Sequence, residues 1–168
     1  PARGGSKRIP RKNIREFCGK PIIAWSIHAA QRSGCFDRIL VSTDDLEIAD
    51  LAQQLGAEVP FLRPAELSDD HTGTMDVVVH AIAYIQQAGV TLDAVCCLYA
   101  TAPFVQPTDL QEGLRLLSQV PSDRFVFTVT RYAFPIQRAI RVDADGYTQP
   151  IVTWPHDGIY EVVDGFHR

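Results

Sequence analysis

The sequence predicts an α/β domain with a mostly parallel central sheet. Runs of β-branched residues alternate with segments whose apolar residues recur at helical spacing, which is typical of strand–helix–strand units. The 168 residues suffice for one domain with a substantial core, and 46% of them are hydrophobic. The net charge of −4 argues against binding of the whole molecule to nucleic acid or to a membrane surface.

The predicted elements follow one another in a regular order. They are a helix between Pro21 and Gly34, a strand over 38–43, a helix over 46–55, a strand over 57–62, a helix over roughly 75–88, a strand over 93–100, a helix over 108–119 and a strand over 124–131. We find no internal repeat and no low-complexity linker between them.

Turn and capping residues set the ends of the predicted helices. Pro21 suits a helix start, and Gly34 suits a helix end because glycine adopts the left-handed conformation without a steric cost. Gly56 and Gly89 close the second and third helices. Side chains that can accept from free helical N–H groups precede the last three helices: Asp44 or Asp45, then Asp69, Asp70 or Thr72, then Thr108 as an N-cap.

The strands are predicted from β-branched and apolar runs. "RILVST" and "RFVFTVTR" are rich in Val, Ile, Thr and Phe, and the second run also alternates. "DAVCCLYA" is apolar through most of its length, as expected of a central strand buried on both faces. Its neighbouring cysteines, Cys96 and Cys97, suit reduced core thiols better than a disulfide framework, which favours a cytoplasmic location.

In open parallel sheets, ligands bind beyond the carboxyl ends of the strands. The predicted strand order therefore brings four polar stretches to one rim of the sheet. These are residues 1–13, 42–45, 99–103 and 130–138.

The opening stretch "PARGGSKRIPRKN" concentrates positive charge in an acidic chain. It holds five of the sixteen Lys and Arg residues and none of the twenty acids. Gly4 and Gly5 allow close backbone approach and can present N–H groups to an anion. Ser6 adds a hydroxyl, Lys7 and Lys12 add mobile point charges, and Arg3 adds a planar fork.

This combination of residues suits a polyphosphate. A Walker P-loop and a G-x-G-x-x-G motif are both absent, so neither motif supports that interpretation. Charge alone equally fits a solvated basic surface segment. The two glycines and the position before a helix favour phosphate.

Several motifs resemble the sugar-acid cytidylyltransferases, which make CMP-activated nonulosonic acids. They are "PARGGSKRIPRKN", "GKPIIAWSI", "FDRILVSTDDLEIA", "GAEVPFLRPAELSDDHTGT" and "YATAPF". Within that family, Arg8, "ELSDDHTGT" and "FPIQRA" look most like the pseudaminic acid cytidylyltransferases. The likeness runs from residue 1 to about residue 149. It implies a three-layer, Rossmann-like nucleotidyltransferase fold.

The resemblance also implies roles for individual residues. It assigns the triphosphate of CTP to Arg3, Ser6, Lys7 and Lys12, with Arg3, Lys7 and Lys12 as the catalytic groups, and Gly4 and Gly5 belong to the same nucleotide site. Asn13 would contact the nucleotide, and Arg63 and Thr74 would form the cytidine pocket. The sugar acid would be contacted by Thr101, Gln137 and Arg138.

Two departures from the sialic acid enzymes bear on the sugar. Those enzymes have Gln where this chain has Tyr99 and Arg where it has Val105. Both differences favour another sugar acid, with pseudaminic acid first. CMP-N-acetylneuraminate and CMP-Kdo synthetases remain the alternatives within the same fold.

The implied reaction explains the basic opening stretch. The anomeric hydroxyl of the sugar acid attacks the α-phosphorus of CTP and pyrophosphate leaves, so the protein must position and neutralise phosphate. The resemblance implies Mg²⁺ as cofactor, CTP and a nonulosonic acid as substrates, and a homodimer. It implies neither nucleic acid nor a membrane as partner.

The C-terminal residues depart from the family. We expect a cytidylyltransferase domain over 1–149, with its first strand missing, and a divergent or truncated segment over 150–168. The family's metal-binding aspartates have no evident counterpart, although Asp157 and Asp164 are candidates. "YEVVDGFHR" looks more like a ParB-type motif, so a non-catalytic nucleotide-binding fragment or a ParB-like binding module is the alternative from another class.

Overall fold

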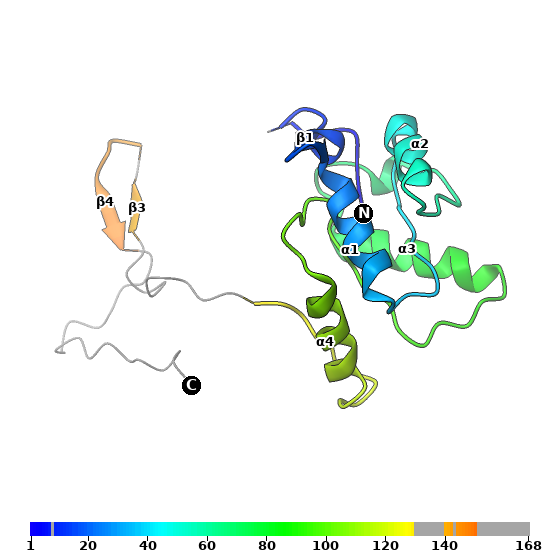
Figure 1. Ribbon diagram of the computed structural model, residues 1–168. Helices are drawn as coiled ribbons and strands as arrows, with labels where there is room; N and C mark the ends of the chain where they lie inside the picture. The colour runs from blue at the N-terminus through cyan, green and yellow to red at the C-terminus, as the bar shows by residue number, and fades with distance from the viewer. Residues whose placement is uncertain (8, 130–139, 143, 151–168) are drawn as a thin grey trace. The chain divides into compact units, whose positions relative to one another are not determined.

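The computed structural model describes residues 1–7, 9–129, 140–142 and 144–150 (Figure 1). The chain divides into two compact units, Pro1–Val126 and Phe127–Arg168. In the second unit, β3 (Ile140–Val142) pairs antiparallel with β4 (Thr148–Pro150). Gly146, with φ 87°, lies in the turn between them. This hairpin is the regular structure described in the second unit.

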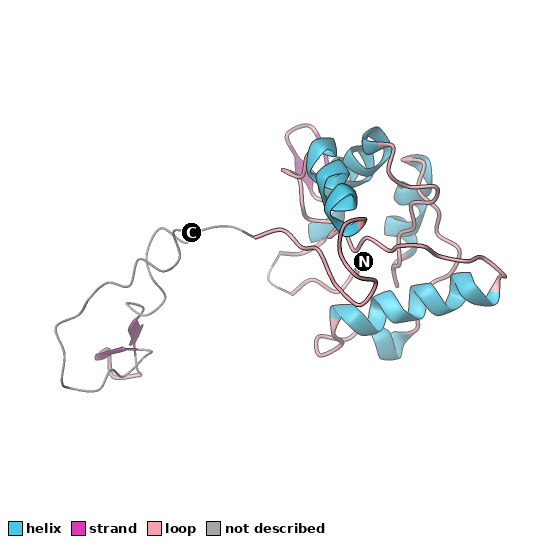
Figure 2. Ribbon diagram, turned by 90° about the horizontal axis from the view of Figure 1, so that it is seen from below, coloured by secondary structure: helices cyan, strands magenta, loops and turns pink. Residues whose placement is uncertain are grey.

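The first unit consists mainly of helices and loops (Figure 2). Its elements are η1 (Lys12–Ile14), β1 (Glu16–Phe17), β2 (Lys20–Pro21), α1 (Ile22–Ser33), α2 (Leu46–Gln54), η2 (Ala65–Leu67), α3 (Thr74–Gln87) and α4 (Pro107–Leu117). β1 and β2 form a short antiparallel hairpin. Among the helices in the described part of the chain, none has the length and apolar character of a membrane span.

The four long helices occupy nearly the predicted ranges. Pro21 directly precedes α1, and Gly56 and Gly89 follow α2 and α3 with φ 83° and 81°, so these predicted ends are confirmed. Two further ends are also confirmed. Gly34 ends α1 in the left-handed conformation, with φ 66°. Asp45 caps α2, because its Oδ1 atom accepts a hydrogen bond from the Ile48 N–H at 3.1 Å. Local sequence was sufficient here, since each of these devices acts within one helical turn.

The predicted caps of the last two helices are wrong. α3 follows Gly73, which offers no side-chain cap. The Asp69 carboxylate instead accepts the N–H groups of His71 and Thr72 within its own loop. α4 begins one residue early, at Pro107, and the cap is a reciprocal pair: the Gln106 side chain accepts from the Asp109 N–H and the Asp109 side chain accepts from the Gln106 N–H.

Two predicted strands run side by side in parallel, although each pairs only at isolated points. Leu40 bridges Glu58, and Thr43 bridges Leu62. The backbone bonds Val41 N–H to Glu58 O and Arg63 N–H to Thr43 O measure 2.8 and 2.7 Å. This pairing supports an α/β arrangement and orders the chain around residues 42–45.

The predicted central strand over 93–100 is not formed. Val95 is 49% exposed, and Cys96 and Cys97 are exposed free thiols, so the expectation of buried core cysteines is wrong. A strand needs backbone partners, and among the described residues none pairs with the backbone of 93–98. The described part of the last predicted strand, 124–129, is not a strand either.

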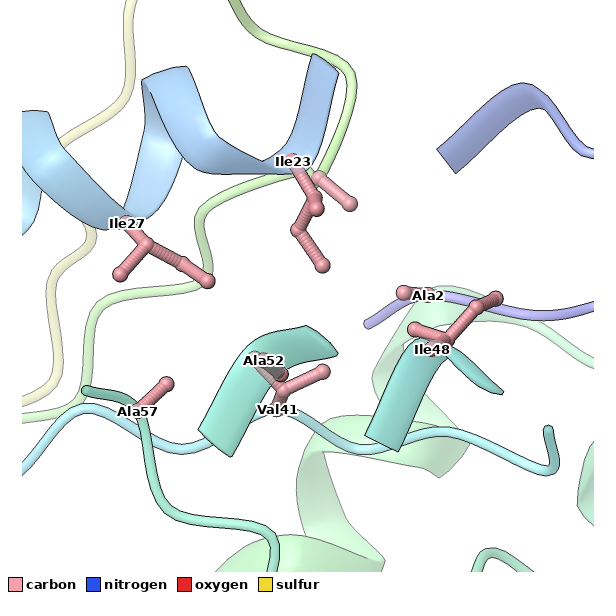
Figure 3. Close-up of a cluster of buried hydrophobic side chains, with 8 residues drawn as sticks. Ala2, Ile23, Ile27, Val41, Ile48, Ala52 and Ala57 are labelled. Atoms are coloured by element: carbon pink, nitrogen blue, oxygen red, sulfur yellow. The ribbon is translucent and has the colours of Figure 1, made fainter. Parts of the chain in front are cut away.

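The core of the first unit lies between α1, α2 and the paired segments. Ile23 and Ile27 of α1 point toward Val41 and Ala52 (Figure 3). The same cluster includes Ala2 of the opening stretch and Ala100 at the end of the 93–100 segment. The N-terminal loop is therefore anchored to the core on its buried side, which leaves its polar side chains free to line a cavity.

Candidate functional site

A cavity of about 680 Å³ opens in the first unit, lined by residues from three separate parts of the chain. These parts are 1–13, 63–77 and 99–101. Of the four polar stretches predicted to share a rim, the first and the third line this cavity, and the second braces its wall. The fourth, 130–138, lies outside the described residues.

The cavity wall is rich in positive charge. Arg3, Lys7, Lys12 and Arg63 all line it. Among the ion pairs of the described residues, Lys12 takes part in none. Arg11, one residue earlier, faces a different partner and pairs with Asp45 at 2.9 Å. The opening stretch thus presents Arg3, Lys7 and Lys12 to the cavity and Arg11 to the start of α2. Lys12 is available to a ligand.

Three backbone contacts position the opening loop. The Ala2 N–H donates to Ser42 O at 2.9 Å, and the buried Asn13 amide donates to Arg3 O at 2.8 Å. The Gly4 N–H donates to Asp44 Oδ1 at 3.0 Å. This last bond departs from our expectation of a free glycine N–H, and neither Gly4 nor Gly5 lines the cavity. The opening loop therefore presents side chains, more than its glycine backbone, to the cavity.

Arg63 is a buried brace as well as a lining residue. It is only 5% exposed. Its Nη1–H donates to Ser42 O at 3.2 Å, its Nε–H donates to Ser68 Oγ at 3.0 Å, and Asp44 lies 3.6 Å from Nη2. Burial lowers the pKa of Arg63, and the Asp44 carboxylate opposes that shift. The guanidinium thus connects the end of one parallel segment with the loop that follows the other.

Two acidic residues enter the same wall. Asp70 accepts a hydrogen bond from Arg3 Nη2 at 2.6 Å and forms an ion pair with Lys7. Lys7 and then Arg3 lower the pKa of Asp70. Asp69 is held within its loop by Thr72, whose side chain and N–H lower the pKa of Asp69. The sequence indicated both acids as candidate helix caps and did not predict these contacts with the opening loop.

A further part of the cavity wall is formed by α3 and the end of the 93–100 segment. Thr74 Oγ1 lies 3.2 Å from the Tyr99 hydroxyl, and both residues line the cavity. The Ser26 hydroxyl donates to Tyr99 O at 2.9 Å, which ties this segment to α1. Thr101 also lines the cavity. The sequence marked Tyr99 only as a departure from a related family and did not place it at the site.

The remaining predicted residues divide into two groups. Ser6 and Asn13 line the cavity with the cations. Gln137, Arg138, Asp157 and Asp164 lie outside the described residues. In the described ranges, no group of three or more His, Cys, Asp or Glu residues could hold a metal ion. The described part of the chain therefore does not supply an all-protein metal site.

Comparison with known proteins decides the family. The family model described as cytidylyltransferase matches residues 1–136. The chain belongs to the cytidylyltransferase family. The match spans the cavity and every cation that lines it, so the resemblance seen in the sequence motifs is confirmed at the level of the family.

Two curated relatives each match more than two thirds of this chain. The chain is 49% identical over 139 residues to a pseudaminic acid cytidylyltransferase of Campylobacter jejuni, covering 83% of this chain and 60% of that relative. It is 43% identical over 116 residues to a CMP-N,N'-diacetyllegionaminic acid synthase of Legionella pneumophila, covering 69% of this chain and 50% of the relative. The chain thus spans about 60% or less of the length of these relatives.

A solved structure supports the fold of this family member. CMP:2-keto-3-deoxy-manno-octonic acid synthetase complexed with CTP matches with a TM-score of 0.60 and 25% identity, covering 73% of this chain and 46% of that chain. This likeness is compatible with an α/β nucleotidyltransferase fold. The small pairings in the described residues do not by themselves establish a three-layer parallel sheet.

Proposed function

We propose that this chain carries the nucleotide-binding part of a cytidylyltransferase that transfers CMP from CTP to a nonulosonic sugar acid, with release of pyrophosphate. Pseudaminic acid is the favoured acceptor, because the relative at 49% identity acts on that sugar by name. The single observation that carries the proposal is the cationic cavity within the matched residues, where Arg3, Lys7 and Lys12 converge from one loop.

The proposed chemistry uses these cations to neutralise charge. The anomeric hydroxyl of the sugar acid attacks the α-phosphorus of CTP, the bond to the β-phosphate oxygen breaks, and pyrophosphate leaves. Positive groups that hold the phosphates in line stabilise the charge that develops on them. Lys12 suits this role best, because it has no competing ion pair among the described residues.

The nucleoside would bind beside the loop cations. Thr74 supplies a hydroxyl to the cavity, Asn13 holds the opening loop through Arg3 O, and Arg63 braces the end of the 42–43 segment. Thr101 lies on the side proposed for the sugar acid, and Gln137 and Arg138 are assigned there by family likeness alone. Mg²⁺ enters this proposal only with the nucleotide, whose phosphate oxygens are ligands that it prefers, and we derive no step through it.

The sheet architecture, the oligomeric state, the location and the domain bounds belong to the same proposal. A three-layer Rossmann-like sheet is supported by the parallel pairing of 39–43 with 58–63 and by the matched synthetase structure. A homodimer and a domain over 1–149 followed by a divergent segment over 150–168 rest on the family resemblance. A cytoplasmic location rests on the four cysteines without a disulfide framework.

The test is pyrophosphate release with CTP and Mg²⁺, comparing pseudaminic acid, N-acetylneuraminic acid and Kdo. We expect release with pseudaminic acid and a loss of about tenfold or more in kcat/KM for Lys12→Ala. Lys20→Ala is the matched control, because Lys20 lies over the Trp25 ring and not at the cavity. Equal activity of both variants would contradict the role of Lys12. CTP binding without turnover would favour the non-catalytic alternative.

A further inference from the structure

The side chains proposed to hold phosphate already hold a carboxylate. Asp70 Oδ1 accepts from Arg3 Nη2 at 2.6 Å, and Asp70 Oδ2 pairs with Lys7 Nζ. The second terminal nitrogen of Arg3 donates to Asp69 O at 2.6 Å. Two of the three cations that the opening loop brings to the cavity are therefore occupied by residues of the 68–72 loop.

The carboxylate of Asp70 resembles a phosphate in the way it is bound. It presents two oxygens to a guanidinium and an ammonium, which is the arrangement that these cations make with phosphate oxygens. Because Lys7 and Arg3 lower its pKa, Asp70 is ionised at neutral pH. A phosphate group and Asp70 cannot occupy the same donors of Arg3 and Lys7 at once.

The Asp70 side chain can leave its partners while the rest of the 68–72 loop stays in place. The loop has other contacts: Asp69 accepts from the side chain and N–H of Thr72 and from the N–H of His71, and Ser68 Oγ accepts from the buried Arg63. The contacts of Asp70 to the opening loop are solvent-accessible, since its side chain is 33% exposed and that of Lys7 is 82% exposed. Ion pairs of this kind are weak and are readily exchanged for another anion.

We propose that Asp70 is a displaceable anion that occupies the phosphate subsite of the free protein, so that a ligand must carry enough negative charge to replace it. The inference rests on the proposed function, since it assumes that Arg3 and Lys7 bind phosphate. It makes Asp70 a determinant of specificity: a triphosphate displaces the carboxylate, whereas a ligand with one phosphate competes poorly.

The test measures tripolyphosphate binding by titration calorimetry at low ionic strength and without divalent cations. Asp70→Asn removes the competing charge, and we expect about three- to tenfold tighter binding than in the unaltered chain, given the usual strength of exposed ion pairs. Glu66→Gln is the matched control, because Glu66 is an exposed acid in the adjoining η2 and takes part in no ion pair among the described residues. The control separates loss of a contact from loss of one unit of net charge.

Two outcomes would overturn the proposal. One is Asp70→Asn binding tripolyphosphate no more tightly than the Glu66→Gln control, and the other is no binding by any of the three proteins. A parallel titration with CTP and GTP keeps this result apart from the proposed function. If Asp70→Asn binds tripolyphosphate more tightly but shows no preference for CTP over GTP, the displaceable anion is supported and the cytidylyltransferase function is not. If the unaltered chain releases pyrophosphate but Asp70→Asn binds tripolyphosphate no more tightly, the function is supported and the displaceable anion is not.

Discussion

A Cβ atom placed on Gly4 would lie 2.4 Å from Asp45 Oδ2, closer than side chains pack. The same Asp45 caps α2 through its other oxygen. One residue before it, Asp44 accepts the Gly4 N–H. The glycine of the opening loop is therefore enclosed by two consecutive carboxylates at the start of α2, which sets the position of the neighbouring Arg3.

Gly4→Ala should destabilise the protein by about 1–2 kcal/mol, because Asp45 must give up its cap or the loop must shift. Gly5→Ala is the matched control, since nothing lies within 4 Å of a Cβ added there. It should change the free energy of unfolding by less than about 0.5 kcal/mol. Urea denaturation of both variants measures the difference, and equal stabilities would show that the loop does not depend on this close approach.

Arg63→Lys should be strongly destabilising although it conserves charge. A lysine carries one nitrogen and cannot reach both Ser42 O and Ser68 Oγ as the buried guanidinium does. A buried polar group left without a partner costs about 1–3 kcal/mol. Arg38→Lys, at an exposed ion pair with Glu58, is the comparison and should cost less than about 1 kcal/mol. Similar losses in the two variants would argue against the brace.

The core cluster predicts a contrast within one helix. Ile48→Ala should lower the free energy of unfolding by about 2–5 kcal/mol. Ile48 is 1% exposed, so removing most of its side chain leaves a cavity between α2 and the opening stretch. Leu46→Ala removes a residue of similar size from the first turn of α2, where the side chain is 66% exposed. It should change stability by less than about 0.5 kcal/mol. Thermal unfolding distinguishes the two results, and a large loss in Leu46→Ala would place that residue in an interface.

The ion pair between Arg38 and Glu58 predicts a pH dependence. Arg38 lowers the pKa of Glu58, so this pair stabilises the fold above the ordinary pKa of a glutamate, and the contribution is lost as pH falls through the lowered pKa. Glu58→Gln should therefore cost at most about 1 kcal/mol at neutral pH and nothing in acid. A loss of the same size in strong acid, where the carboxyl group is protonated, would point to another cause.

Helices were predictable where their signals are local. The end of α1 at Gly34 and the cap of α2 at Asp45 follow from residues within one turn. Thr108 is a good N-cap in isolation, which made it the predicted cap of α4. In the structure, Gln106 and Asp109 cap the helix as a reciprocal pair, so α4 begins at Pro107 and Thr108 lies inside it. Such a choice depends on two side chains together and not on the preference of either one.

The strands show the limit of sequence patterns. Apolar character predicted both 38–43 and 93–100, yet only the first meets a partner, at 58 and 62. An apolar run can predict burial only if other segments cover it, and that depends on residues far away in the chain.

The site was predictable in its charge and not in its contacts. The concentration of cations in residues 1–13 indicated an anion site before any fold was known. The role of Asp70 was missed because it lies 67 residues from Arg3 and meets it only after the 68–72 loop folds back. No sequence spacing predicts a contact between residues so far apart in the chain.

The uncovered apolar segments have a practical consequence for handling the purified chain. Phe125 is 82% exposed and Val95 is 49% exposed, each within a run of β-forming residues. Exposed runs of this kind pair with copies of themselves, so we expect turbidity to grow with protein concentration and on storage. The accessible thiols of Cys96 and Cys97 add covalent cross-linking in air, which a reducing buffer prevents.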